Sequence, residues 1–152
     1  MFTKILVPYD FSKYATKALN YAIEIAKKFD ATLYLLTVVD PHEYLHGVLL
    51  AQLEDDYSVG DTIKKFIKAE VMACKKKLTK KAKTIAKKGI KVHHHAMKGP
   101  PIDGILDYCT ANKINMIIMG SKGLTGISKI MALGSVSRKI SEIAKCPVMI
   151  VR

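Results

Sequence analysis

Cysteine is scarce in this chain of 152 residues. The three cysteines, Cys74, Cys109 and Cys146, are odd in number and form no Cys-x-x-Cys pair. A disulfide framework or a structural zinc site needs several cysteines at suitable spacings, so neither is expected here. We expect the three thiols to be small core side chains of a protein from a reducing compartment.

Long apolar runs are also missing. No stretch approaches the ~18 consecutive apolar residues of a membrane span, and the first residues lack a basic segment followed by a long apolar one. These absences predict a soluble, cytoplasmic protein with no membrane partner. The length predicts one domain over residues 1–152.

Arginine occurs only at Arg138 and Arg152, although the formal net charge is +12. Residues 61–91 hold twelve lysines against Asp61 and Glu70, which gives this segment a local charge of +10. Its one aromatic residue, Phe66, is expected to face the core. Because base recognition favours arginine and aromatic side chains, we expect no specific nucleic-acid binding. A solvated helix face explains the lysines, and non-specific attraction to polyanions or acidic partners remains the alternative.

Apolar runs alternate with amphipathic segments along the chain. The patterns predict strands at 4–7, 32–38, 90–97, 115–119 and 148–151, and helices at 12–29, 61–88, 102–111 and 135–144, with a short helix within the irregular stretch 40–60. Such alternation predicts an α/β fold, a single-domain doubly wound five-stranded parallel sheet with helices on both faces.

Two of these helices have a clear apolar face. The predicted buried positions are Ala15, Ala18, Leu19, Ala22, Ile25, Ala26 and Phe29 in the first helix, and Ile63, Ile67, Val71, Cys74, Leu78, Ala82 and Ile85 in the second.

The chain contains a glycine motif after its fourth apolar strand. Gly120-Ser121-Lys122-Gly123 follows that strand, and Gly134-Ser135 comes after ten intervening residues. Glycines let backbone N–H groups approach an anion, and a helix that begins at Ser135 adds its dipole, so the pattern is typical of a phosphate site. It is neither a P-loop nor a dinucleotide fingerprint. A glycine turn followed by a helix cap is the alternative.

The first strand ends in Pro8-Tyr9-Asp10. Doubly wound sheets bind ligands at the carboxyl ends of their strands, and both this segment and the glycine motif lie at such ends. Asp10 therefore lies at such an end, where on sequence grounds alone it can act as a helix-entry cap.

Together with Lys4-Ile5-Leu6-Val7 before Pro8 and with Pro147-Val148-Met149-Ile150-Val151, these motifs resemble the universal stress protein family in its nucleotide-binding branch. The resemblance covers nearly the whole chain and is weakest at about 41–60. It implies the strand order 3-2-1-4-5, which brings the first and fourth strands together, and a site for ATP or for AMP or ADP.

In that site Asp10 would bind ribose or adenine, the backbone of Val38 would contact adenine, and Lys122 and Ser135 would bind the phosphates. The full set implied by the resemblance is Pro8, Tyr9, Asp10, Val38, Met119, Gly120, Ser121, Lys122, Gly123, Leu124, Thr125, Gly126, Gly134, Ser135, Val136 and Ser137.

One spacing departs from the family pattern. The family has Gly-x2-Gly-x9-Gly-Ser/Thr, whereas ten residues separate Gly123 from Gly134 here. An extra residue in a helix rotates the subsequent residues by about 100°, whereas a loop can absorb it with both anchors in place. The region of Gly126 is where the extra residue is most easily accommodated, because glycine tolerates unusual backbone angles.

His93, His94 and His95 suggest a metal site at first sight. Alternation along a strand places His93 and His95 on one face and His94 on the other, so we predict a polar edge strand and no structural metal. A divalent cation such as Mg²⁺ or Mn²⁺ would bind through the phosphates of a bound nucleotide.

The function predicted from the sequence is that of a nucleotide-responsive stress or regulatory protein, with no catalytic residues. Two alternatives are a slow ATPase or nucleotidyl-transferring relative, and a nucleotide-free dimeric interaction module. The family also implies a homodimer that pairs through Val148-Met149-Ile150-Val151. The stress, the protein partners and the preferred nucleotide are not encoded in these motifs.

Overall fold

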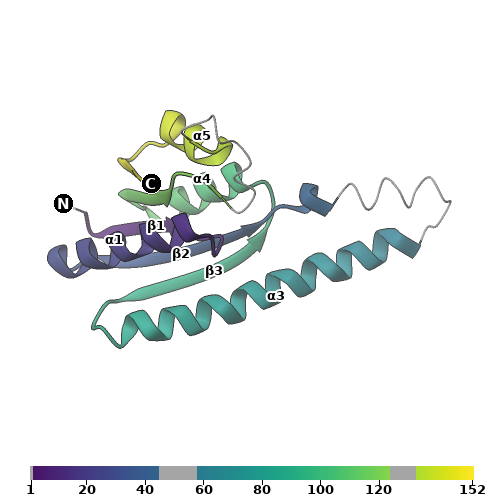
Figure 1. Ribbon diagram of the computed structural model, residues 1–152, viewed down its shortest axis with the longest axis horizontal. Coiled ribbons are helices and arrows are strands. Elements are labelled where there is room, and N and C mark those ends of the chain that lie inside the picture. The colour runs from purple at the N-terminus through teal and green to yellow at the C-terminus, as the bar shows by residue number, and fades with distance from the viewer. Residues whose placement is uncertain (1, 45–57, 124–132) are drawn as a thin grey trace.

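A computed structural model describes residues 2–44, 58–123 and 133–152 (Figure 1). Its elements are β1 (Lys4–Pro8), α1 (Lys13–Phe29), β2 (Thr32–Val39), the 3₁₀ helix η1 (Pro41–Tyr44), α3 (Ser58–Ala86), β3 (Val92–Lys98), α4 (Pro101–Asn112), β4 (Met116–Gly120), α5 (Ser135–Ile143) and β5 (Val148–Val151).

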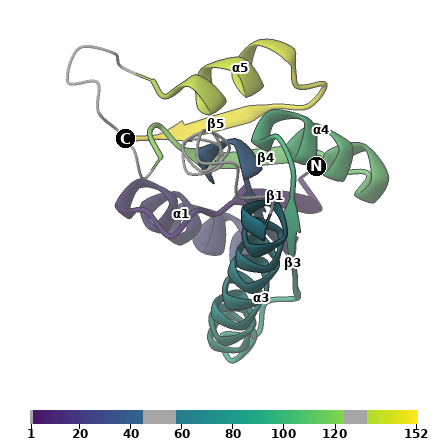
Figure 2. The ribbon, with the colours of Figure 1, turned by 90° about the vertical axis from the view of Figure 1, so that its right-hand side faces the viewer.

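The five strands form one sheet in the order β3-β2-β1-β4-β5, and all their pairings are parallel. Helices α1 and α3 cover one face, and α4 and α5 cover the other (Figures 1 and 2). The central strand β1 serves both layers, since Ile5 and Val7 pack with α1 and α3 whereas Leu6 packs with α4 and α5. The predicted fold class and strand order are confirmed.

Helix α1 begins where the sequence predicts. Ser12 is its N-cap, with the hydroxyl oxygen accepting a hydrogen bond from the backbone N–H of Ala15 at 3.1 Å. The predicted buried face is correct except at its edges. Ile23 is buried, four residues after Leu19, whereas Phe29 in the last turn is 42% exposed and contacts only the edge of the Phe2 ring among the aromatic side chains described.

Helix α3 starts at Ser58 and ends at Ala86, slightly earlier than predicted at both ends, and Gly89 turns the chain at φ 78°. Its 29 residues span about 43 Å, whereas the seven residues of β3 span about 23 Å. The N-terminal half of α3 therefore extends past the sheet (Figure 1). None of the helices in the described ranges combines the length and the apolar character needed to cross a bilayer.

The prediction that Phe66 faces the core is wrong. Its side chain lies on the extended half of α3, is 55% exposed, and packs edge-on against Tyr44 with ring centroids 5.3 Å apart. The neighbouring Ile67 takes the inward position instead. Ile67 packs with Val39 at the end of β2, and the side chain one position away on the helix points in a different direction.

This correction predicts a small effect for Phe66→Ala. Loss of one exposed aromatic contact should lower the free energy of unfolding by about 1 kcal/mol or less, against the roughly 3–5 kcal/mol typical of a core phenylalanine. Urea denaturation of the variant and the wild type measures the difference. A loss in the core range would show that the ring is buried in solution.

Candidate functional site

Two turns lie side by side at the carboxyl edge of the sheet. Strands β1 and β4 are neighbours in register, with Ile5 opposite Met116. The turn after β1, residues 9–12, is called here the first-strand turn, and residues 120–123 after β4 form the glycine turn. A Cβ placed on Gly123 would lie 3.0 Å from Oδ2 of Asp10. The two motifs singled out in the sequence are therefore in contact, at the point where the winding direction of the sheet reverses.

The first-strand turn is held by β2. The backbone N–H of Tyr9 donates to the carbonyl of Leu36 at 2.8 Å, and the hydroxyl of Thr37 donates to the carbonyl of Tyr9 at 2.6 Å. Thr37 is the buried polar side chain of β2, whose other polar residue, Thr32, is only partly buried at the start of the strand. Sequence reasoning missed its role, although a threonine among leucines and valines is a signal that could have been used.

Asp10 uses its two carboxylate oxygens differently. Oδ1 accepts a hydrogen bond from the backbone N–H of Ser12 at 3.0 Å, which closes the turn before α1. Oδ2 faces Gly123. Phe11, which lies between Asp10 and Ser12 in the chain, has φ 65°, an unfavourable value for a bulky residue. Thus one oxygen orders the helix entry, as the cap interpretation predicts, and the other faces the glycine turn, where its role in ligand binding stays a prediction.

The glycine turn is fixed to its surroundings through Ser121. Its N–H donates to the carbonyl of Val151 at 2.8 Å, and its own carbonyl accepts from the N–H of Gly134 at 2.7 Å and from the hydroxyl of Ser137 at 2.9 Å. Gly134 thereby lies against the glycine turn even though ten residues separate it from Gly123. Both ends of the glycine motif are together despite the extra residue.

Helix α5 begins at this junction. Gly134 is its N-cap and, as a glycine, supplies no side-chain hydrogen bond to the N–H groups of the first turn. Ser135 is exposed at the first helical position. Ser137 is buried and donates to the carbonyls of Ser121 and Gly134, so its hydroxyl joins the two segments. Of the Ser135 and Ser137 hydroxyls, only that of Ser135 is therefore accessible to an incoming anion.

Val38 lies near the end of β2, and its backbone faces the β1 side. The carbonyl of Leu36 bonds Tyr9 on that side, and the carbonyl of Val39 bonds Gly99 on the other. Since alternate residues of a strand direct their backbone groups to the same side, the groups of Val38 point past the end of β1. Its side chain packs toward Gly104 of α4.

The remaining predicted positions divide into three groups. Pro8 and Met119 belong to the strands, and the Met119 side chain is buried among the residues under α4 and α5. Lys122 is half-buried in the glycine turn, and Val136 packs beside Ile140 in α5. Leu124, Thr125 and Gly126 lie outside the described residues.

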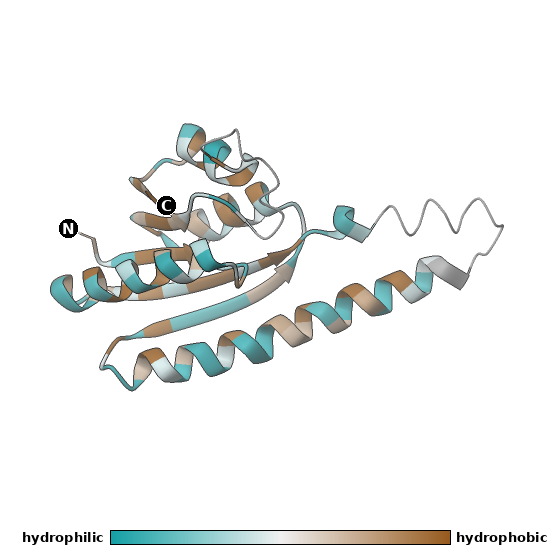
Figure 3. Ribbon diagram, viewed as in Figure 1, coloured by the Kyte–Doolittle hydropathy of each residue, from teal (hydrophilic) through white to brown (hydrophobic). Residues whose placement is uncertain are grey.

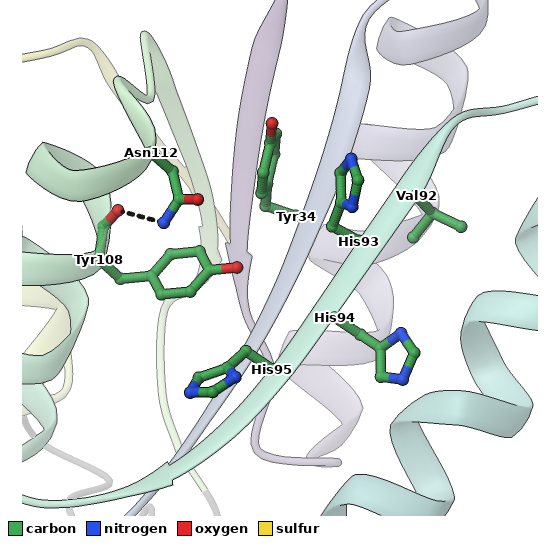
Figure 4. Close-up of a pocket in the computed structure, with 7 residues that line it drawn as sticks. All are labelled: Tyr34, Val92, His93, His94, His95, Tyr108 and Asn112. Atoms are coloured by element: carbon green, nitrogen blue, oxygen red, sulfur yellow. Dashed lines mark hydrogen bonds between the residues drawn. The ribbon is translucent and has the colours of Figure 1, made fainter.

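A cavity of about 460 Å³ lies elsewhere, at the outer edge of the sheet (Figure 4). His93 stacks on Tyr34 with centroids 5.0 Å apart, and His95 stacks on Tyr108 at 5.9 Å. His94 points to the opposite face and bonds the Thr79 hydroxyl at 2.9 Å. The predicted alternation is correct, and β3 is visibly more hydrophilic than β2 (Figure 3). Within the described ranges, no three His, Cys, Asp or Glu side chains gather as metal ligands.

The cysteines are poor nucleophiles in this structure. Burial, followed by the nearby Cys146, raises the pKa of Cys109 to about 12. Burial and then the charge of Glu70 raise the pKa of Cys74, and burial raises that of Cys146. Thiols with raised pKa values stay protonated near neutral pH, which makes these three cysteines less reactive than an unperturbed thiol.

The fold and these turns define a class: doubly wound α/β proteins with a glycine turn at the switch point of the sheet. The family model for the universal stress protein family matches residues 1–152. A universal stress protein of Methanocaldococcus jannaschii, MJ0531, is 33% identical and is matched over 100% of this chain and 83% of its own length. YxiE of Bacillus subtilis is also 33% identical, with 100% of both chains matched. The chain belongs to the universal stress protein family.

Solved structures share this fold. The universal stress protein UspA from Lactobacillus plantarum superposes with a TM-score of 0.83 at 25% identity, covering 99% of this chain and 98% of that one. A universal stress protein in complex with cAMP has a TM-score of 0.63 at 21% identity, covering 99% of this chain and 97% of that one. The protein from Archaeoglobus fulgidus in complex with dAMP has a TM-score of 0.57 at 17% identity, covering 100% and 98%.

Proposed function

We propose that this universal stress protein binds an adenine nucleotide between the first-strand turn and the glycine turn, and that occupancy alters its interactions with other proteins. The observation that carries the proposal is the contact between the two turns, with Oδ2 of Asp10 3.0 Å from the position of a Cβ on Gly123. A carboxylate oxygen thus faces the glycine turn, and that turn contacts the start of α5 through the bond from Gly134 to Ser121, an arrangement that suits a ligand with both hydroxyl and phosphate groups.

Each part of the site has a distinct role in this proposal. Oδ2 of Asp10 accepts hydrogen bonds from the ribose hydroxyls, and the backbone of Val38 binds the adenine edge. The N–H groups at the start of α5, the Ser135 hydroxyl and Lys122 bind the phosphates. Mg²⁺ or Mn²⁺ would bind mainly through the phosphates. Relatives of the same fold hold cAMP and dAMP, which share adenine, a pentose and phosphate.

Analysis of the natively purified protein tests this proposal. Protein denatured after native purification should release adenine nucleotide, identified by mass spectrometry, and the stripped protein should bind ATP or AMP saturably by calorimetry. The comparison of ATP with AMP gives the preferred phosphate length. No retained nucleotide and no binding at millimolar ATP would leave the nucleotide-free dimeric interaction module as the better account.

Asp10→Asn tests the ribose contact. The asparagine oxygen can still accept the bond from Ser12, while the negative charge facing Gly123 is lost. We expect affinity for ATP to fall roughly 10- to 100-fold, since hydrogen bonds to charged groups contribute about 1.5–3 kcal/mol. The loss should be smaller with 2′-deoxy-ATP if the 2′-hydroxyl is one of the donors.

Asp30→Asn is the matched control. It removes the same charge from the other end of α1, where Asp30 is an exposed left-handed C-cap that asparagine also tolerates. Equal weakening by both variants would point to net charge and would contradict a contact by Asp10.

We further propose a homodimer through β5, at the edge of the sheet. Val148, Met149 and Ile150 are only partly covered in the single chain, and an uncovered apolar edge strand favours pairing. Light scattering at micromolar concentration should give twice the mass of the chain, and a monomer would refute this part.

Slow ATP hydrolysis is the second functional candidate, and phosphate release that is abolished together with binding would support it.

A further inference from the structure

The surface of α3 and β3 lacks negative charge over a long stretch. No aspartate or glutamate occurs between Glu70 and Asp103, a segment that contains ten lysines. Four of them, Lys76, Lys80, Lys83 and Lys87, are exposed and follow one another at steps of four, three and four. The helical hydrogen-bond pattern continues to the last of them, since the N–H of Lys87 donates to the carbonyl of Lys83. We call these four residues the lysine ridge.

The ridge runs along the solvent side of the helix. At 100° per residue the four lysines fall within an arc of about 60° and extend about 16 Å along the axis. Leu78, Ala82 and Ile85 occupy the opposite side and are buried against the sheet. Hydrophilic and apolar residues alternate along α3, as expected for a helix with one buried side (Figure 3).

The fold does not require this arrangement. Lysines four residues apart on a helix repel one another. The helix dipole favours cations only in the last turn, near Lys83 and Lys87, and leaves Lys76 and Lys80 unexplained. Among the described residues, the ion pair on α3 joins Lys64 to Asp61, in the other half of the helix. Lys77 and Lys81 differ from the ridge, because they lie over the rings of Phe11 and Tyr9.

We propose that the lysine ridge is a docking surface for linear inorganic polyphosphate. A single file of ammonium groups complements an unbranched chain of phosphates, and lysine binds phosphate as a point charge without requiring a fixed geometry. Binding would release the counterions condensed on the polyanion, which supplies affinity without any shaped pocket.

Other anionic partners fit the ridge less well. A membrane-bound helix needs an apolar face to insert, and here that face is buried against the sheet. Single-stranded RNA binding relies on aromatic stacking, whereas the only aromatic of α3, Phe66, lies in its other half against Tyr44. Base reading favours arginine, and both arginines lie outside α3 and β3.

The test compares two variants of equal charge. In the ridge variant Lys76, Lys80, Lys83 and Lys87 are changed to Gln, and in the control variant the exposed lysines of α1, Lys13, Lys17, Lys27 and Lys28, are changed to Gln. Each variant lowers the net charge by four, so a difference between them reports position. Circular dichroism melts check that both fold.

We expect wild-type protein to bind long-chain polyphosphate in a fluorescence titration, and the ridge variant to bind roughly tenfold more weakly or worse. The slope of log affinity against log salt should become shallower by about 3, since each lost phosphate contact removes about 0.7–0.9. The control variant should change affinity less than about threefold, as expected for charges outside the contact region. Polyphosphate should also raise the melting temperature of the wild type.

Three results would overturn the proposal. Equal losses in the two variants would assign binding to net charge alone. In a competition titration, single-stranded RNA of matched phosphate content could displace polyphosphate at equal concentration. RNA would then be the occupant of the ridge. The wild type could also bind vesicles of anionic phospholipid and not polyphosphate, with vesicle binding lost only in the ridge variant. The ridge would then be a membrane contact.

Discussion

Gly123→Asp is expected to reduce affinity for ATP by roughly 100-fold or more. The new side chain would begin 3.0 Å from Oδ2 of Asp10, so two carboxylates would share the space that we assign to the nucleotide. A carboxylate about 5 Å from a phosphate repels it by roughly 3 kcal/mol per unit charge at an effective dielectric constant of about 20. Calorimetric titration of stripped protein with ATP measures the loss.

The fold should survive this change. Gly123 is exposed and lies in a turn, and the atom that a Cβ there would approach belongs to a side chain. Gly123→Ala should weaken binding less than Gly123→Asp, because it adds bulk without charge. Gly60→Asp is the matched control, since a Cβ there meets nothing within 4 Å and the position lies in the first turn of α3. Full ATP affinity in a folded Gly123→Asp variant would remove the glycine turn from the site.

The parts of this molecule that were predictable depend on periodic patterns. Steps of three and four residues located the buried face of α3, and alternation along β3 separated His94 from His93 and His95. The strand order came from the family resemblance, and it brings the first-strand turn beside the glycine turn. Local pattern gives the elements, but it does not contain the distances between their ends.

The parts that were missed depend on contacts between distant segments. Nothing near Ser121 in the sequence shows that its carbonyl accepts hydrogen bonds from Gly134 and Ser137, or that the Ser137 hydroxyl is buried. Phe66 was misplaced because an aromatic side chain on a long helix suggests burial, whereas that half of α3 extends past the sheet. Thr37 supports the first-strand turn through one hydrogen bond across 28 residues.

Gly120→Ala should produce the largest loss of stability among the changes considered. A Cβ on Gly120 would lie 2.7 Å from the carbonyl carbon of Tyr14 and 2.8 Å from the backbone nitrogen of Ala15. Because these are backbone atoms of α1, rotation of a side chain cannot relieve the overlap, and the helix must move away from β4. We expect the free energy of unfolding to fall by roughly 3 kcal/mol, at the upper end of the usual cost of overpacking. Chemical denaturation measures it.

Gly60→Ala separates this steric effect from the general effect of replacing glycine. The Cβ at position 60 meets nothing within 4 Å, so alanine in that helical turn should leave stability unchanged or raise it by up to about 1 kcal/mol. In folded Gly120→Ala protein, ATP affinity should also fall, since the displaced start of α1 carries Ser12, whose N–H holds Asp10 in place. Stability equal to that of the wild type would mean that α1 and β4 are farther apart in solution. Unchanged affinity in a destabilised variant would instead show that the first-strand turn holds its position independently of α1.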